Sequence, residues 1–164
     1  MKDITFREAQ ALSSPNPFGL LVSTDSQGNP NLMALSWWTY ASNKPPTLLI
    51  CISSRGYSAE LVNEGGEFTL CLVDESMKET AFACGTCSGR AVSKAEKFSI
   101  TLEPSVMVAT PYVSCSRLVF ECKVVEKTQA GDHIVLIAEV AATHADESRK
   151  HLYSLDGYKR LDTV

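Results

Sequence analysis

Two short segments of this chain carry side chains whose types and spacing suit the binding of a phosphate group beside a planar ring. In Ser53-Ser-Arg-Gly-Tyr-Ser58, a buried strand is expected to turn into a helix, with Arg55 in the turn and Ser58 capping the helix. A guanidinium, a hydroxyl and free backbone N–H groups at a helix start together form an anion site. In Asn31-Leu-Met-Ala-Leu-Ser-Trp37, a strand is expected to lead to a large flat indole ring. Each of these residues, taken singly, is more often structural than functional.

Three more side chains could contribute polar or aromatic contacts. Asn31 lies within a predicted strand, where asparagine is disfavoured unless it makes specific hydrogen bonds. Trp37 and Trp38 point to opposite faces if the strand continues through them, so only one can face a ligand. His133 follows Gly131-Asp132 and offers a ring N–H donor, although a lone histidine at a hairpin is usually only a turn residue. A Ser/His/Asp hydrolase is not excluded by residue content, but the chain contains no Gly-x-Ser-x-Gly elbow.

The chain has six cysteines. Four of them fall within or beside apolar, strand-like stretches and are expected to pack as small hydrophobes: Cys51, Cys71, Cys115 and Cys122. Cys84 and Cys87 form a single Cys-x-x-Cys, which without a second pair is a weak metal signal. We therefore predict no metal site. The pair is interpreted as structural or merely reactive thiols, with a redox dithiol as the alternative.

The elements that must position these residues are mostly strands. Strands are expected at 18–24, 31–38, 47–53, 67–73, 106–109, 117–126 and 133–143. Turns are expected at 25–30 and 129–132, which are rich in turn-forming residues. Along 117–126 the side chains alternate between two faces, as a half-buried strand requires. A helix is expected from Ser58 to about residue 63, ending at Gly65-Gly66. Two Ser-x-x-Glu capping boxes, at 76–79 and 93–96, predict short helices near 77–83 and 94–98. The tail from 146 onward is expected to form a helix and an extended segment.

This pattern predicts a mainly β protein with short helices, folded as a closed or partly closed antiparallel barrel. A doubly wound parallel sheet would need longer helices between successive strands. With 164 residues the chain suits one domain, spanning 1–164.

Composition and missing motifs exclude several classes of partner. A net charge of -4, with no basic stripe, argues against nucleic acid. No apolar run approaches the ~20 residues that span a bilayer, and the start lacks the apolar core of a secretory signal. We therefore expect a cytoplasmic protein with no membrane partner. Neither Gly-x-Gly-x-x-Gly after a strand nor Gly-x-x-x-x-Gly-Lys-Ser/Thr occurs, which argues against a dinucleotide or nucleoside triphosphate bound in the usual manner.

The two segments above, the Cys84-Gly-Thr-Cys-Ser-Gly-Arg90 run, Lys94 and Gly131-Asp-His133 occur in a characteristic order and spacing. In these features the chain resembles the flavin reductase-like FMN-binding split-barrel family, and within it the flavoredoxin-like branch. The resemblance extends from Pro17 to Tyr158. It implies a split, Greek-key-like β-barrel that holds one FMN per site, non-covalently, in a homodimer.

The same resemblance implies which residues contact FMN. It places Arg55 and Ser58 at the phosphate, selects Trp37 over Trp38 for the flavin, and leaves Trp38 for the core or a subunit interface. It favours Lys94 as a second positive group, with Lys97 as the alternative. The full predicted set of cofactor contacts is Asn31, Met33, Ala34, Ser36, Trp37, Ser53, Arg55, Ser58, Ser88, Lys94 and His133. No catalytic side chain is predicted, because in such proteins the isoalloxazine performs the redox chemistry.

Three functions remain open on the sequence. The first is an FMN-dependent oxidoreductase of the flavin reductase type, with NADH or NADPH as a transient electron donor. The second is an electron carrier that holds FMN tightly and exchanges electrons with a redox protein. The third is a thiol redox protein working through Cys84 and Cys87. The sequence does not identify the electron acceptor, the preferred nicotinamide cofactor, or whether FMN is a prosthetic group or a substrate.

Overall fold

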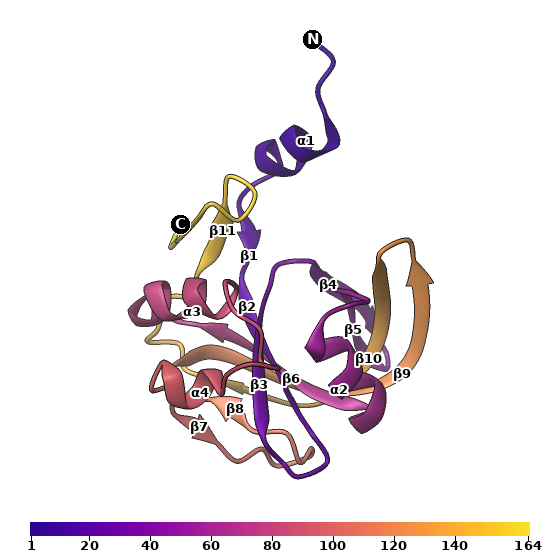
Figure 1. Ribbon diagram of the computed structural model, residues 1–164, viewed down its shortest axis with the longest axis vertical. Coiled ribbons are helices and arrows are strands. Elements are labelled where there is room, and N and C mark those ends of the chain that lie inside the picture. The colour runs from indigo at the N-terminus through magenta and orange to yellow at the C-terminus, as the bar shows by residue number, and fades with distance from the viewer.

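The computed structural model describes residues 1–164 and is built around one antiparallel sheet of seven strands. In spatial order the strands are β3 (Pro30–Leu35), β2 (Gly19–Thr24), β6 (Glu67–Val73), β9 (Ser116–Ala130), β10 (His133–Ala145), β5 (Pro46–Ser53) and β4 (Trp38–Asn43). The predicted mainly β, antiparallel architecture is confirmed, and the sequence predicts each of these strands except β4. The predicted turns lie where β2 meets β3 and where β9 meets β10 (Figure 1).

The sheet curls because of one very short connection. β3 and β4 follow each other in the chain but lie at opposite edges of the sheet, and only Ser36 and Trp37 join them. Two residues span that gap only if the edges come close together, which makes the sheet a nearly closed barrel with a split at this link. The Cys51 backbone N–H donates to the Trp37 carbonyl oxygen at 2.8 Å, so the pairing between β4 and β5 continues into this link. The predicted continuous strand over 31–38 is therefore wrong, because the chain leaves one edge at Leu35 and enters the other at Trp38.

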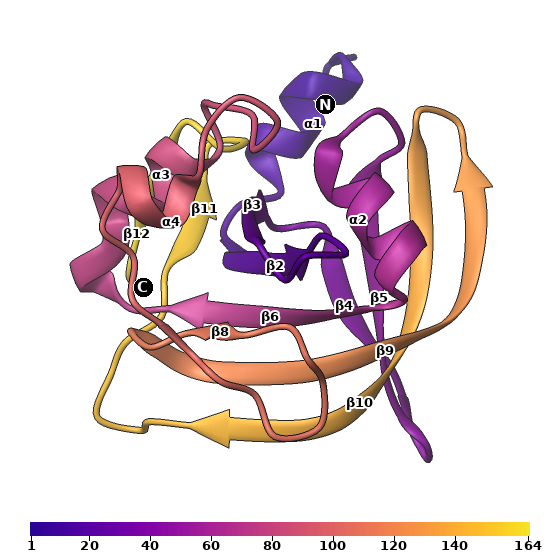
Figure 2. The ribbon, with the colours of Figure 1, turned by 60° about the horizontal axis from the view of Figure 1, so that its bottom comes forward.

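Both faces of the sheet are covered by apolar side chains. Along β6, Phe68, Leu70 and Leu72 point to one core, whereas Cys71 and Val73 point to a second. The first core includes side chains of α2 (Tyr57–Gly65). This helix lies on the inner side of the curved sheet (Figure 2). The second lies under α3 (Lys78–Cys84), α4 (Lys94–Lys97) and the C-terminal strands. The alternation along 117–126 separates the two cores, with Val119 in one and Phe120 in the other. That part of β9 is buried on both faces, so the prediction of a half-buried strand is wrong there, because each face is covered by a separate core.

The helices occur where the sequence predicts them, but their first residues differ. Gly56, not Ser58, is the N-cap of α2, and the helix ends at Gly66 with φ +70°, as the Gly65-Gly66 pair predicts. Both predicted capping boxes are wrong. Asp74 caps a short 3₁₀ turn (Glu75–Met77) that precedes α3, and Ser93 makes no side-chain cap bond to α4.

A further helix, α1 (Phe6–Leu12), is absent from the sequence prediction. Its signal is present in the chain, because the Thr5 hydroxyl accepts from the Glu8 N–H while the Glu8 carboxylate accepts from the Thr5 N–H. The helix stands apart from the main sheet, beside the turn that follows β11 (Figure 1).

Two small sheets complete the fold. The first has the strand order β1 (Asn16–Pro17), β11 (Tyr153–Leu155) and β12 (Arg160–Asp162). The last two strands lie in the tail, where the sequence predicts a helix, so that prediction is wrong. The other pairs β7 (Leu102–Glu103) with β8 (Tyr112–Val113). The predicted strand at 106–109 is also wrong. This segment is a loop whose backbone N–H groups bond to carboxylates, those of Val106 and Met107 to the buried Glu121.

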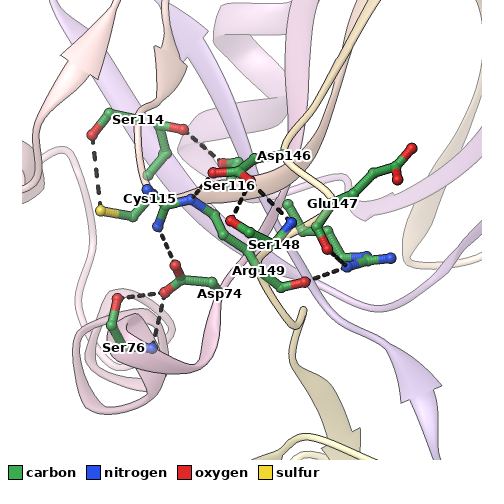
Figure 3. Close-up of polar contacts among 11 residues, drawn as sticks. Asp74, Ser76, Ser114, Cys115, Ser116, Asp146, Glu147, Ser148 and Arg149 are labelled. Atoms are coloured by element: carbon green, nitrogen blue, oxygen red, sulfur yellow. Dashed lines mark hydrogen bonds and ion pairs between the residues drawn. The ribbon is translucent and has the colours of Figure 1, made fainter.

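A polar network fixes the path from β10 to β11. Arg149 hydrogen-bonds to Asp74 at the end of β6 and, through Nε at 2.8 Å, to Asp146 just after β10 (Figure 3). Asp74 also accepts from the backbone N–H of Ser76 at 2.9 Å. The segment after β10 is thereby tied to the far end of β6, from where it continues into the C-terminal hairpin. None of the helices is both long enough and apolar enough to cross a bilayer.

Candidate functional site

Two adjoining cavities lie beside the split and share Met33 and Ala34 of β3 as a common wall. The first, here called the split cavity, has a volume of about 360 Å³ and lies between the Ser36–Trp37 link, the end of β5 and the C-terminal hairpin. The second, the loop cavity, has a volume of about 340 Å³ and lies between β3, the start of α2 and the 84–89 loop. The predicted residues that line the split cavity are Met33, Ala34, Ser36, Trp37, Ser53 and His133. Those that line the loop cavity are Asn31, Met33, Ala34, Ser58, Ser88 and Lys94.

An aromatic wall forms one side of the split cavity. The rings of Trp37 and His133 stack with centroids 4.8 Å apart and planes inclined by 29°. Trp37 is 43% exposed, so its ring remains accessible from the cavity side. His133 Nδ1 lies 2.7 Å from an Asp132 carboxylate oxygen, and this hydrogen bond lowers the pKa of Asp132. Trp38 instead packs against the core inside the sheet and donates from Nε1 to the Pro17 carbonyl oxygen at 3.1 Å.

Asn31 lines the loop cavity and holds a buried acceptor that has no hydrogen-bond partner. Its Nδ2 donates to the Ser58 hydroxyl at 2.8 Å, while its Oδ1 is buried and has no hydrogen-bond partner. A buried carbonyl oxygen without a partner is costly, so such an atom indicates a missing donor. Gly89 lies directly against it, because a Cβ at Gly89 would come within 1.9 Å of Asn31 Oδ1. The absence of a side chain at Gly89 is therefore needed for this arrangement.

Lys94 supplies a buried positive charge to the same cavity. It is 5% exposed, and its Nζ donates to the carbonyl oxygens of Leu32 and Cys84, both at 2.7 Å. An ammonium has three N–H donors, so one remains for a ligand. Burial lowers the pKa of Lys94, and the nearby thiols of Cys87 and Cys84 oppose that shift. The alternative, Lys97, is exposed and lies near the Phe98 ring, outside both cavities.

The structure separates the two residues that the sequence places together at a phosphate. Ser58 is buried inside the first turn of α2 and faces Asn31, so its predicted role as the N-cap is wrong. Arg55 is exposed in the turn before the helix and lines neither cavity. Gly56 and Tyr57, at the uncapped start of α2, do line the loop cavity. The backbone N–H groups of a helix start are thus near Lys94, whereas the Arg55 guanidinium is outside.

The 84–89 loop is held over α2 from its far side. Arg90 forms an ion pair with Glu60 of α2, and its guanidinium lies 5.1 Å from the centroid of the Tyr57 ring. The hydrogen bond to Arg90 lowers the pKa of Glu60. This contact ties the end of the loop to the first turn of α2.

Tyr158 is the most prominent site residue that sequence reasoning missed. It lines the split cavity, has φ +73°, and follows Asp156 and Gly157, which also have positive φ. Burial raises the pKa of Tyr158 to about 12, and the neighbouring Ser36 opposes that shift; the Ser36 hydroxyl donates to Ser154 at 2.9 Å. Asp156-Gly157 is a recognisable turn signal, but the pairing that brings this turn to β3 is not encoded locally.

The thiols show little sign of reactivity. All six cysteines are free, and Cys71 and Cys122 are buried in the cores as predicted. Burial raises the pKa of the Cys84 thiol to about 11, which keeps it protonated and poorly nucleophilic. This argues against a thiol redox function that depends on Cys84.

Comparison with known proteins gives consistent matches. The family model described as "Flavin reductase like domain" matches residues 13–162. An uncharacterized protein of Archaeoglobus fulgidus is 32% identical over 118 residues, which cover 71% of this chain and 67% of that protein. The NADH-dependent flavin reductase StyB of Pseudomonas fluorescens is 29% identical over 144 residues, which cover 87% of this chain and 79% of StyB.

Solved structures share the fold. Flavoredoxin of Desulfovibrio vulgaris (Miyazaki F) aligns with a TM-score of 0.87 at 23% identity, covering 100% of this chain and 93% of that one. A putative flavin reductase with a split barrel domain from Shewanella frigidimarina NCIMB 400 aligns with a TM-score of 0.80 at 24% identity, covering 86% and 72% of the two chains. The nearly closed seven-stranded sheet is therefore a split barrel.

Proposed function

This chain belongs to the flavin reductase-like domain family, and from that premise we propose that it is an oxidoreductase that binds FMN non-covalently across the split cavity and the loop cavity. The observation that carries this proposal is the orphaned Oδ1 of Asn31. A ribityl chain has hydroxyl groups that can donate to such an acceptor, and Asn31 lines the same cavity as Lys94, whose ammonium is buried. A polyhydroxylated chain that ends in a phosphate matches this pair of groups.

The residues present fit FMN in three parts. Lys94 and the backbone N–H groups at the start of α2 are assigned to the phosphate, since both favour an anion. Asn31 and Ser58 are assigned to the ribityl chain. The isoalloxazine is assigned to the split cavity, where the stacked pair of Trp37 and His133 offers a flat apolar surface.

When bound, FMN supplies the redox chemistry, and the protein controls its position and surroundings. The stacked pair restricts the orientation of a planar ring, and Met33 and Ala34 form the floor between the two cavities. The hydroxyls of Tyr158 and Ser154, both of which line the split cavity, are assigned as donors to polar atoms of a ring bound there, while the Ser36 hydroxyl donates to Ser154.

The proposed electron donor is NADH or NADPH, in keeping with the similarity to the NADH-dependent reductase StyB. The alternative is a flavoredoxin-like carrier that receives electrons from a redox protein. Stopped-flow mixing of the FMN-loaded protein with each nicotinamide cofactor separates the two. Rapid bleaching of the flavin absorbance supports the reductase, whereas no bleaching with either cofactor supports the carrier.

We also assign the protein to a homodimer. The supporting feature is β4, an edge strand on which Tyr40 is 65% exposed. Exposed aromatic side chains and open strand edges are both features of subunit interfaces.

Titration of the flavin-free protein with FMN, followed by quenching of flavin fluorescence, tests the proposed function. We expect saturable binding of one FMN per chain. The variant Gly89→Ala should weaken FMN and riboflavin binding alike, by about tenfold, because the new Cβ displaces Asn31 Oδ1. Gly65→Ala is the matched control, since a Cβ there has its nearest neighbour at 4.0 Å. The proposal is overturned if the wild-type protein binds no flavin.

A further inference from the structure

A third cavity adjoins the two already described and differs from both in its lining. This aromatic cavity has a volume of about 220 Å³ and is lined by Phe18, Ala34, Phe82, Gly85, Thr86 and Tyr158. It shares Ala34 and Tyr158 with the split cavity, and Ala34, Gly85 and Thr86 with the loop cavity. No charged side chain lines it, whereas Lys94 lines the loop cavity.

Small residues keep this space open. A Cβ on Gly85 would lie 3.2 Å from the Cβ of Ala34 and 3.3 Å from the Phe82 carbonyl oxygen. Where Ala34 and Gly85 meet, larger side chains would fill the room now left between the aromatic rings. The cavity therefore depends on two of the smallest residues lying opposite each other.

The rings around the cavity are only partly packed. Phe18 is fully buried and contacts Tyr158 edge to face, with centroids 6.1 Å apart and planes inclined by 69°. Phe82, in contrast, is 42% exposed although it lines the cavity. An exposed aromatic ring at the mouth of an apolar cavity leaves apolar surface in water, and a ligand that covers this ring removes that surface.

The conformation of Tyr158 adds a second indication. A bulky residue with positive φ is disfavoured, and such strain gathers at ligand-binding positions. This backbone conformation sets the Tyr158 ring between the split cavity and the aromatic cavity, where it lines both.

We infer that the aromatic cavity binds an uncharged, planar compound with a single aromatic ring, at a site distinct from that proposed for FMN. Size supports one ring, because an apolar cavity of about 150 Å³ holds benzene. Charge is disfavoured, since no lining side chain can pair with an ion and burying an unpaired charge is costly. The lining supplies three aromatic rings for stacking or edge-to-face contact.

Isothermal titration calorimetry with phenol tests this inference, using the FMN-loaded protein and the flavin-free protein in parallel. We expect saturable binding to both, with a Kd on the order of 1 mM. Benzoate, the charged analogue, should bind at least about tenfold more weakly. The two-ring compound 2-naphthol should also bind more weakly than phenol, because it exceeds the cavity.

Two variants of Phe82 locate the binding. Phe82→Ala removes one wall, and Phe82→Trp occupies part of the space; each should weaken phenol binding about tenfold. Because Phe82 is exposed, neither change disturbs the core. Phe6→Ala is the control, because Phe6 is also exposed but lies on α1, away from the cavity; this variant should bind phenol like the wild type.

Several outcomes overturn the inference. They are the absence of phenol binding to the wild-type protein, equal binding of phenol and benzoate, unchanged affinity in both Phe82 variants, and displacement of phenol by FMN. The last result would place phenol in the split cavity instead. Phenol binding to a protein that binds no flavin would contradict the proposed function and leave this site intact, so the two proposals fail separately.

Discussion

At the scale of single residues, Lys94 differs from an ordinary surface lysine in how its charge is compensated. Both of its hydrogen bonds go to carbonyl oxygens, which satisfy two donors without neutralising the positive charge. A buried ammonium without a carboxylate partner favours an anion nearby. Arg55, by contrast, is exposed, and a contact between it and a bound phosphate requires its side chain to turn inward from the rim.

The contribution of Arg55 can be measured by comparing two ligands that differ only in the phosphate. We predict that Arg55→Ala weakens FMN binding about tenfold, the loss of one charge-assisted contact, and leaves riboflavin binding unchanged. Fluorescence titration with each ligand measures both affinities. Arg7→Ala, at another exposed arginine, is the control. Equal losses for FMN and riboflavin would show that Arg55 does not contact the phosphate, and no loss for either would leave this role to Lys94.

At the scale of elements, Arg149 is one of several contacts that tie the segment before the C-terminal hairpin to the end of β6; the backbone bond from the Leu152 N–H to the Val73 carbonyl oxygen is another. Burial alone would raise the pKa of Asp74, but hydrogen bonds from Ser76 and Arg149 outweigh it and hold the pKa below its usual value. A depressed carboxyl pKa stabilises the folded state above the unfolded-state pKa of about 3.9. That contribution is lost as the pH falls through the lower folded-state value, because the protonated carboxyl no longer pairs with Arg149.

We therefore predict that Arg149→Ala lowers the free energy of unfolding by about 2 kcal/mol at pH 7. The difference from the wild type should shrink as the pH falls below the unfolded-state pKa of about 3.9. Urea denaturation at several pH values measures this. Arg160→Ala is the control, since its nearest carboxylate oxygen, on Asp156, is 3.9 Å away and both side chains are well exposed. A difference between Arg149→Ala and the wild type that stays constant with pH would contradict the assigned role of Asp74.

The elements also show what the sequence could predict. The Asp25–Pro30 turn, the Gly65-Gly66 helix end and the alternating strand at 117–126 depend on neighbouring residues, and they appear where expected. The break at Ser36–Trp37 and the strands of the tail depend on partners far along the chain, so local pattern could not reveal them. In the candidate site, Asn31, Lys94 and His133 were found by residue type and resemblance. Tyr158 was missed, because β11 pairs with β1, more than a hundred residues earlier in the chain.

At the scale of the whole molecule, the proposed homodimer needs a test that leaves the barrel folded. Trp38 is unsuitable, because it packs against the core inside the sheet and against Phe120. Tyr40, two residues on, also contacts Trp38 and Phe120 edge to face, with ring centroids 5.7 and 6.1 Å apart, but it is 65% exposed on the edge strand β4 and can be replaced without emptying the core. In a two-fold dimer one patch serves both subunits, so a single substitution removes two contacts.

We predict that Tyr40→Glu shifts the protein from dimer to monomer in sedimentation velocity and weakens FMN retention with it. The same change at Val125, an apolar residue of β9 that is 58% exposed, is the control and should leave the dimer intact. A wild-type protein that sediments as a 17.9 kDa monomer with FMN bound would contradict the dimer. Dissociation by Val125→Glu alone would instead place the interface on the β9–β10 hairpin.

The two-residue link between β3 and β4 sets a limit on how this chain can change in length. The turn before β3 and the turn between β9 and β10 are exposed and can take up extra residues without moving a core side chain. An insertion between Leu35 and Trp38 has no such freedom. One added residue would either shift the register of β4 against β5, turning Trp38 away from the core, or widen the split at the cavity. Insertions and deletions in homologous chains should therefore accumulate in the outer turns, while the length of this link stays constant.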